Sequence, residues 1–248
     1  MRSLVDPIDH LQLHSLLQLS VAGVRLDITQ AVLFMWIGCG VLVTMFLLAS
    51  RQTAVVPRGM RVVLEVLLLF IREDIVKRTM GIHGIRYFPV IATLFFFILV
   101  CNWVGLVPLP RSYTATSNIS VTAALALFVF VLVQVEGVRI KGIRGYLRGF
   151  IPEGVPSMLL PLMVPIEIIS LVARPFSLAI RLFANMLAGH ILILVFIGMA
   201  TTGFWLLKAV PLLGAAVMSL FEIFVGLVQA YIFSMLTAIY LSEAVGES

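Results

Sequence analysis

The chain has 248 residues, of which 61% are hydrophobic and 12% are charged, and its mean hydropathy is +1.13. A typical soluble domain is about 45–50% apolar and about 25% charged, so this composition excludes a soluble globular domain, a disordered chain and a disulfide-stapled secreted scaffold. The formal net charge of +5 comes from basic residues between apolar runs, where membrane topology explains them better than nucleic-acid binding does.

Three apolar runs in the first part of the chain are each long enough for a membrane span, which takes about 20 residues as a helix. They cover 31–50, 88–108 and 119–135, and the last two predict a spanning hairpin. The stretch 61–79 differs, because charged residues such as Glu65, Arg72 and Asp74 recur among its apolar residues. This stretch predicts an amphipathic helix that lies on the membrane surface or packs beneath it.

The C-terminal third contains two unusually long apolar runs, 156–200 and 209–241. As one helix the first run would reach roughly 67 Å, about twice the thickness of the hydrocarbon core. It must therefore tilt strongly, bend or break, and Pro175 is the expected point of bending. We expect these runs to form a long, slanted antiparallel hairpin. The predicted fold class is an all-α polytopic membrane protein, with residues 1–248 as a single membrane domain.

The basic residues predict the orientation of the chain. Seven lie between positions 51 and 86 and four between 139 and 148, whereas the 109–118 loop has only Arg111. Because short cytoplasmic loops are enriched in Lys and Arg, the segments 51–87 and 136–155 are expected on the cytoplasmic side, or on the matrix side in an organelle. The N-terminus and the 109–118 loop then lie outside, and the C-terminus lies inside.

Polar residues within the long runs are the candidates for function, because a charge in a membrane span usually marks a pathway or a partner. They are Glu167, Arg174, Arg181, Asn185, His190, Glu222 and Gln229. At about 100° per residue the first four form one stripe along a helix, whereas His190 points away from Arg181 by about 180°. On the second run, Glu222 and Gln229 are seven residues apart and share a face.

Arg181 is the sharpest signal, because a guanidinium stays charged and needs a carboxylate or water. Glu167 lies about 21 Å away along the helix, which is too far for an ion pair. The countercharge is therefore either Glu222 of the hairpin partner or a carboxylate on another chain. The alternative to a functional role is a buried Arg181–Glu222 pair that only fixes the hairpin.

The other ionisable residues lie on both sides of Arg181. Glu167 is expected either to line a watery cavity open to the inner side or to reach the interface as a snorkelling carboxylate. His190 titrates near neutral pH, which suits a proton relay with Glu222, although a membrane histidine often only bonds a neighbouring helix. Gln229 does not titrate and is expected to hydrogen-bond. A continuous proton path would not have a fixed positive charge in its middle. The pattern therefore favours two offset half-pathways separated by Arg181, with a mobile carrier that moves the proton between them.

Two competing functions are weaker. An ion-coupled secondary transporter would show inverted repeats or two broken helices in matching positions, and the sequence shows neither. A membrane-embedded enzyme with a histidine base would need a second histidine or a metal-ligand cluster such as HExxH. Cys39 and Cys101 lie in apolar runs without partners at metal-ligand spacing, and no GxxxxGK[ST] loop is present. We therefore expect no cofactor, no metal and no nucleotide site.

The segment ARPFSLAIRLFANMLAGH (173–190) resembles the signature of subunit a, the stator proton-channel subunit of rotary F-type ATP synthases. The resemblance continues in order over roughly residues 85–245. It includes FPVIATLFFFILVCNWVGLVP (88–108), SNISVTAALAL (117–127) and LVQAYIFSMLTAIYLSEA (227–244). The family implies one N-terminal span, an amphipathic helix, a spanning hairpin and two tilted helices that curve against a ring of c subunits.

The resemblance also implies roles for the polar residues. Arg181 is the family's essential charge, which faces the carboxylate of the c-ring, with Asn185 one turn further and Gln229 across from it. Glu167 falls where the family lines its inner half-channel. The outer half-channel positions are His190 and Glu222, where many bacterial members carry the same two residue types exchanged. Another departure is Thr116, where members often carry Asp.

The family further implies partners and a location. The partners are the c-subunit ring, the peripheral-stalk b subunits, the rest of the ATP synthase complex and membrane lipid, with no nucleic acid. The chain would be a non-catalytic subunit without a nucleotide site of its own. Protons are favoured over sodium, because His190 is a proton-transfer residue. The expected location is a bacterial plasma membrane, with the mitochondrial inner membrane as the alternative.

Overall fold

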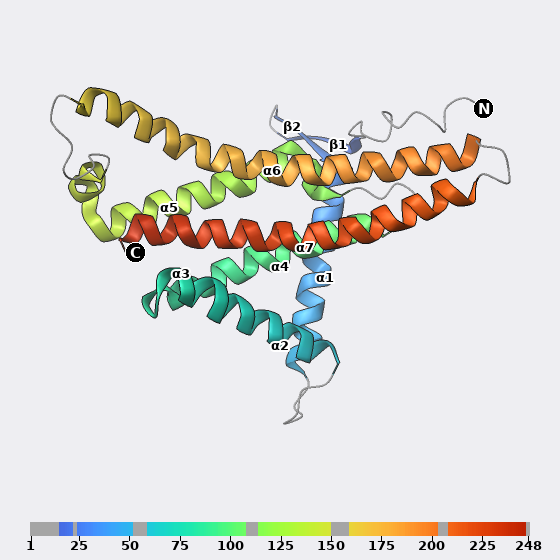
Figure 1. The fold of residues 1–248 in the computed structure, drawn as a ribbon, viewed down its shortest axis with the longest axis horizontal. Helices are drawn as coiled ribbons and strands as arrows, with labels where there is room; N and C mark the ends of the chain where they lie inside the picture. The colour runs from blue at the N-terminus through green and yellow to red at the C-terminus, as the bar shows by residue number, and fades with distance from the viewer. Residues whose placement is uncertain are drawn as a thin grey trace. The chain divides into compact units, whose positions relative to one another are not determined.

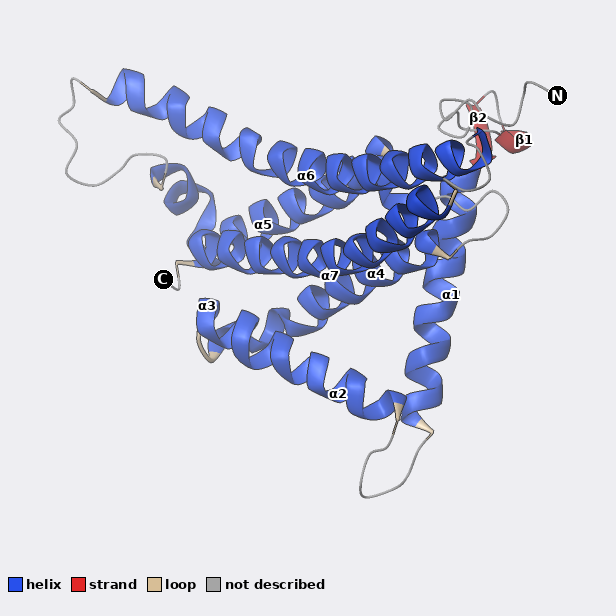
Figure 2. Ribbon diagram, turned by 45° about the vertical axis from the view of Figure 1, so that its right-hand side comes forward, coloured by secondary structure: helices blue, strands red, loops and turns tan. Residues whose placement is uncertain are grey.

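The computed structural model describes residues 15–21, 24–51, 59–107, 114–149, 159–202 and 208–246. Arg111 and half of its predicted outer loop, residues 109–113, lie outside these ranges, as do parts of the predicted inner segments 51–87 and 136–155. Within the described ranges, helices make up every regular element except two short strands (Figure 2).

Five of the described helices are long and apolar enough to cross a membrane. They are α1 (Gln30–Ser50), α4 (Phe88–Leu106), α5 (Ile119–Arg148), α6 (Leu160–Thr202) and α7 (Ala209–Val245). Many of their large apolar side chains are exposed, such as Trp36, Phe176 and Leu220. This exposure suits a lipid environment, because in water such surfaces would drive aggregation. The predicted all-α polytopic fold class is confirmed.

The charged stretch between the first two spans is helical, as its amphipathic pattern predicts. It consists of α2 (Met60–Phe70), the π-helical turn η2 (Ile71–Lys77) and α3 (Arg78–Met80). Gly81 ends it with a φ of 65°, a conformation that favours glycine. A 3₁₀ segment, η3 (His83–Tyr87), then leads into α4. A further 3₁₀ turn, η4 (Ala115–Ser117), precedes α5.

A two-stranded hairpin precedes α1, and the sequence analysis did not predict it. Strand β1 (Ser15–Val21) pairs antiparallel with β2 (Val24–Thr29), and Val21 lies opposite Val24. The signal was present, because Val24, Leu26 and Ile28 alternate with polar residues, which is the period of a strand.

Two helices are longer or more regular than expected. Helix α5 continues past the predicted end at 135 to Arg148, with a non-helical φ of 68° at Gly142. Charged residues end a membrane span but do not end a helix, so α5 continues through Glu136. Helix α6 is continuous over 43 residues although it contains Pro165 and Pro175, so the run is not broken. At about 1.5 Å per residue it is about 65 Å long.

The chain divides into two compact units. The first comprises Met1–Arg51, Phe96–Val121 and Leu182–Ala230, and the second comprises Gln52–Phe95, Thr122–Arg181 and Tyr231–Ser248. The expectation of one membrane domain over residues 1–248 stays a prediction.

In the first unit, α1 packs on the later part of α4. Ala31 and Phe34 of α1 are buried with Val104 nearby, and the Phe46 and Phe96 rings meet edge to face at 5.2 Å. In the second unit, Ile71 and Ile75 of η2 are fully buried. There the Ser242 hydroxyl donates to the Thr79 carbonyl at 3.0 Å, which ties α3 to the end of α7.

Helices α6 and α7 form the predicted antiparallel hairpin (Figure 1). In the first unit Asn185 bonds Gln229, Gly189 lies against Glu222, and Gly214 lies against Phe196. Residue numbers rise along one helix as they fall along the other. In the second unit, Arg174 of α6 likewise bonds Glu243 of α7.

Candidate functional site

Arg181 lies in the middle of α6, and its side chain is exposed. Its helix neighbours Leu178 and Leu182 are buried. None of the ion pairs among the described residues includes Arg181. A guanidinium cannot lose its proton in a protein, so this cation on an apolar helix is available to a partner carboxylate or to water.

Asn185 of α6 and Gln229 of α7 lie side by side in the hairpin. Asn185 follows Arg181 by four residues. The Asn185 Nδ2 donates to Gln229 Oε1 at 2.9 Å. Gln229 is buried, and its Nε2 has no hydrogen-bond partner in the part of the chain that the structure describes. The pair links α6 to α7 close to Arg181 in sequence and leaves one amide donor for a further acceptor.

Glu222 is a buried carboxylate in α7, with 2% of its surface exposed. Neither of its oxygens has a hydrogen-bond partner among the described residues. The side chain lies against Gly189 of α6, where an added Cβ would come within 2.9 Å of Glu222 Cδ and Oε1. The half-buried His190 follows Gly189 directly. A buried carboxylate without partners is costly and is a common mark of a functional site.

Glu167 lines a cavity of about 220 Å³ among α5, α6 and α7. The cavity also has Lys141, Arg174 and Glu243 in its wall. An Arg174 nitrogen bonds Glu243 Oε2, and Lys141 Nζ donates to the Glu243 carbonyl at 3.0 Å. This polar space is large enough for several water molecules. Both expectations for Glu167, a watery cavity and a snorkelling carboxylate, stay predictions.

The sequence analysis missed Glu243 and Tyr240 as part of this cavity. The Arg174 guanidinium lies 5.3 Å from the centre of the Tyr240 ring, so the ring and the Glu243 carboxylate both stabilise that cation. The sequence did contain a signal for this contact. Arg174 lies within about 20° of Glu167 around the helix, and like Arg181 it is a cation that needs a countercharge.

A separate hydrogen-bond network ties α4 to α7 in the first unit. Asn102 Nδ2 donates to the Gly226 carbonyl at 3.2 Å, and Trp103 Nε1 donates to the Ile223 carbonyl at 3.2 Å. The Thr116 hydroxyl donates to Asn102 Oδ1 at 2.6 Å. Thr116 is the position at which the sequence departs from the Asp expected from the family resemblance. Both carbonyls belong to the α7 segment between Glu222 and Gln229, so the network holds that segment.

Within the described residues, no group of three or more His, Cys, Asp and Glu side chains is arranged to hold a metal ion.

Known proteins resemble this chain over nearly its whole length. The family model described as ATP synthase A chain matches residues 32–242. A relative from Maricaulis maris, called ATP synthase subunit a, is 41% identical over 251 residues, which cover 96% of each chain. Another of that name, from Gluconobacter oxydans, is 41% identical over 249 residues and 98% of each chain. A third, from Magnetococcus marinus, is 40% identical over 244 residues, 97% of this chain and 93% of the relative.

Proposed function

The chain belongs to the subunit a family, the proton-conducting stator subunit of the F-type ATP synthase, and we propose that its protons pass through two half-channels separated by Arg181. Membership of this family makes the chain a multi-pass membrane protein and a component of the ATP synthase complex. Its relatives are bacterial, which indicates the plasma membrane. This membership favours the stator role over the secondary-transporter and membrane-enzyme alternatives.

The observation that carries this proposal is the exposed cation at Arg181, which has no ion-pair partner among the described residues. A permanent charge on an apolar helix is stable only beside an opposite charge or water. Among the described residues no ion pair includes Arg181. The partner carboxylate then comes from another chain, and a ring of c subunits supplies one at each step of rotation.

The two half-channels are supported by polar groups on either side of Arg181 in sequence. On the inner side, Glu167 lines the 220 Å³ cavity. On the outer side, Glu222 lies buried against Gly189, next to His190, and supplies a titratable group inside the apolar hairpin. Asn185 and Gln229 hydrogen-bond to each other close to Arg181 in sequence, and the free Gln229 Nε2 is a donor for a ring carboxylate.

Proton transfer then follows from charge and desolvation. A proton from outside passes Glu222 and His190 and neutralises a ring carboxylate, because a neutral carboxyl faces lipid at lower cost than a charged one. Rotation carries that carboxyl round to the inner half-channel. There Arg181 favours its ionised form, because an opposite charge nearby stabilises the anion, and the proton leaves past Glu167. Arg181 also keeps protons from crossing directly between the half-channels.

The same proposal names the neighbours of this chain. The hairpin of α6 and α7 faces the c-subunit ring, since α6 carries Arg181. The peripheral-stalk b subunits hold the chain against rotation, and membrane lipid covers the remaining apolar surface.

ATP-driven acidification of inverted membrane vesicles tests the role of Arg181. Vesicles with the native chain should acidify, and vesicles with Arg181→Ala should not, although the complex assembles. Arg181→Lys should fail as well, because an ammonium lacks the planar fork of donors and can lose its proton. The matched control is Arg144→Ala, which removes an exposed arginine from α5 and should leave acidification unchanged.

Normal acidification by an assembled Arg181→Ala complex would remove Arg181 from the pathway. The half-channel proposal would then fail, whereas the family assignment would stand, because it depends on similarity over the whole chain.

A further inference from the structure

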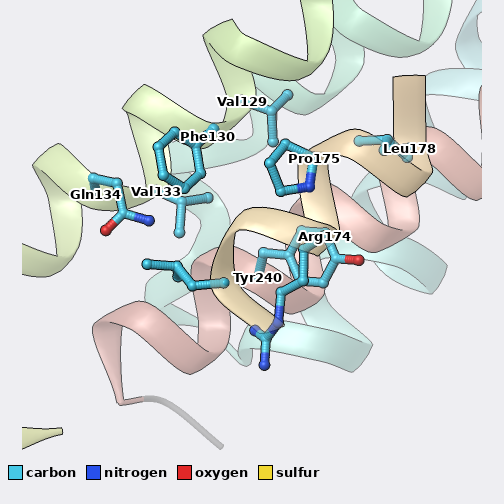
Figure 3. A pocket seen from close by; sticks show the side chains of 9 residues that line it. Val129, Phe130, Val133, Gln134, Arg174, Pro175, Leu178 and Tyr240 are labelled. Carbon is cyan, nitrogen blue, oxygen red and sulfur yellow. The ribbon is translucent and has the colours of Figure 1, made fainter. Parts of the chain in front are cut away.

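A second, smaller pocket lies beside the Glu167 cavity. It is lined by α5, α6 and α7, and Figure 3 shows Gln134 and Val133 of α5 facing Arg174, Pro175 and Leu178 of α6. Its volume for water is about 20 Å³. This space is large enough to hold a bound water molecule. Leu171, Arg174 and Tyr240 line both spaces, which makes them neighbours.

The pocket contains a buried hydrogen-bond donor. Gln134 Nε2 is buried and has no partner among the described residues, whereas Gln134 Oε1 accepts a hydrogen bond from the Tyr146 hydroxyl. With its oxygen bonded to Tyr146, the amide has its nitrogen as the end that lacks a partner among the described residues. Leaving such a donor unsatisfied is unfavourable, and a bound water satisfies it.

The pocket also has a backbone acceptor, which Pro175 creates. In an α-helix the carbonyl of Leu171 accepts from the N–H four residues later, and that residue is Pro175, which has no N–H. The Leu171 carbonyl therefore lacks its regular donor. Gln134, Leu171 and Pro175 all line the pocket, so the residues that supply this donor and this acceptor border the same small space.

We propose that this pocket binds one water molecule between Gln134 Nε2 and the Leu171 carbonyl, and that this water is the part of the inner half-channel nearest to Arg181. The inference depends on the half-channel function proposed above and extends its inner path. The lining residues Arg174 and Leu178 come between Glu167 and Arg181 along α6. Glu167, Arg174, Leu178 and Arg181 lie within about 60° of one another around the helix. The pocket therefore lies on the polar stripe between Glu167 and Arg181, where the proton path needs a connecting group.

The geometry suits proton transfer as well as binding. A water that accepts one hydrogen bond from Gln134 and donates one to Leu171 keeps one lone pair and one O–H. It takes up a proton arriving from the side of Arg181 and passes a different proton to the water of the 220 Å³ cavity, from which Glu167 accepts it. No net charge stays in the pocket, and the nearby Arg174 is already neutralised by Glu243.

A high-resolution density map of the intact native complex, together with passive proton flux through the membrane sector, tests this proposal. The native map should show a water peak about 2.7–3.2 Å from both Gln134 Nε2 and the Leu171 oxygen. Gln134→Leu removes the donor but keeps an apolar side chain that a membrane helix accepts. It should lose the peak and lower the flux about fivefold, the effect of one hydrogen bond. The control Tyr146→Phe removes the hydroxyl that bonds Oε1 but leaves Nε2 in place, and it should keep the peak.

A dry pocket in the native complex overturns the proposal, and this result does not depend on whether any variant assembles. An assembled Gln134→Leu complex with unchanged flux overturns it as well. Glu167→Gln separates the two proposals. If it abolishes flux while Gln134→Leu leaves flux unchanged, the half-channels stand and the water site fails. If Glu167→Gln leaves flux unchanged, the inner half-channel itself is wrong.

Discussion

At the scale of single residues, Glu222 and Gly189 depend on each other. The carboxylate is buried in α7 without a hydrogen-bond partner in the described part of the chain, and it fits against α6 because Gly189 has no side chain. Desolvation makes a buried carboxylate expensive, so its presence in an apolar hairpin supports the proposed role of Glu222 in proton transfer. Proton exchange is the chemistry that such a group offers.

Replacing Glu222 with Gln separates titration from packing. The amide has nearly the same shape, so the hairpin should assemble, but it cannot carry a proton. Proton entry should slow by about 100-fold or more, which is the usual contribution of a positioned acid–base group. The initial rate of ATP-driven acidification measures this, and an unchanged rate would show that Glu222 is not on the path.

Gly189→Ala tests the position of the carboxylate. The new methyl group would lie 2.9 Å from Glu222 Cδ, which is closer than real contacts allow, so the Glu222 side chain must shift. We expect several-fold slower proton pumping with the complex still assembled, because a flexible side chain moves more easily than a helix. The matched control is Gly198→Ala on the same helix, where nothing lies within 4 Å of an added Cβ. Equal effects of the two changes would contradict this explanation.

At the scale of elements, α7 is held by hydrogen bonds to its backbone. Asn102 and Trp103 of α4 donate to the carbonyls of Gly226 and Ile223, and Thr116 completes the network through Asn102. Gly226 permits this approach, since an added Cβ would lie 3.2 Å from Asn102 Cβ. These contacts set the position of the α7 segment that carries Glu222 and Gln229.

Asn102→Ala should therefore weaken the attachment of α7 to α4. It removes a donor to Gly226 and leaves the buried Thr116 hydroxyl without its acceptor, for a loss of about 1–2 kcal/mol. The thermal stability of the purified complex measures the effect. Thr93→Ala is the control on the same helix, because the Thr93 hydroxyl bonds only the Pro89 carbonyl of its own helix. A stability loss confined to Thr93→Ala would contradict the role of this network.

The sequence predicts the helices better than it predicts the contacts between them. Apolar length alone identifies the five long helices, because in lipid each backbone polar group must be satisfied within its own segment. Arg181 is recognisable for the same reason, since a fixed charge in such a segment has few explanations. The partner of Arg174 was missed, because Glu243 lies 69 residues away along the chain and only the antiparallel hairpin brings it near. The β1–β2 hairpin was missed although its alternation was visible.

At the scale of the whole molecule, the number of spans and the charges of the loops together predict the orientation of the chain in the membrane. The described residues contain five helices that are long and apolar enough to cross a membrane, and five crossings would put the two ends of the chain on opposite sides of the bilayer. The basic residues cluster around α2–α3 and the end of α5, whereas the 109–118 loop has a single arginine. The positive-inside rule then assigns the cluster to the cytoplasmic side, where it predicts that the Glu167 cavity opens.

This orientation is testable with single cysteines in a chain whose native Cys39 and Cys101 are replaced by Ala. A membrane-impermeant maleimide should label Arg111→Cys from outside intact cells, whereas Arg144→Cys should be labelled only in inverted vesicles. The physical reason is that the arginine-rich loops stay on the side from which the chain inserts. Each variant serves as the control for the other, since both replace an arginine outside the apolar runs. Labelling in the opposite pattern would invert the assignment of the two half-channels, so that protons driving synthesis would enter past Glu167 and leave past Glu222.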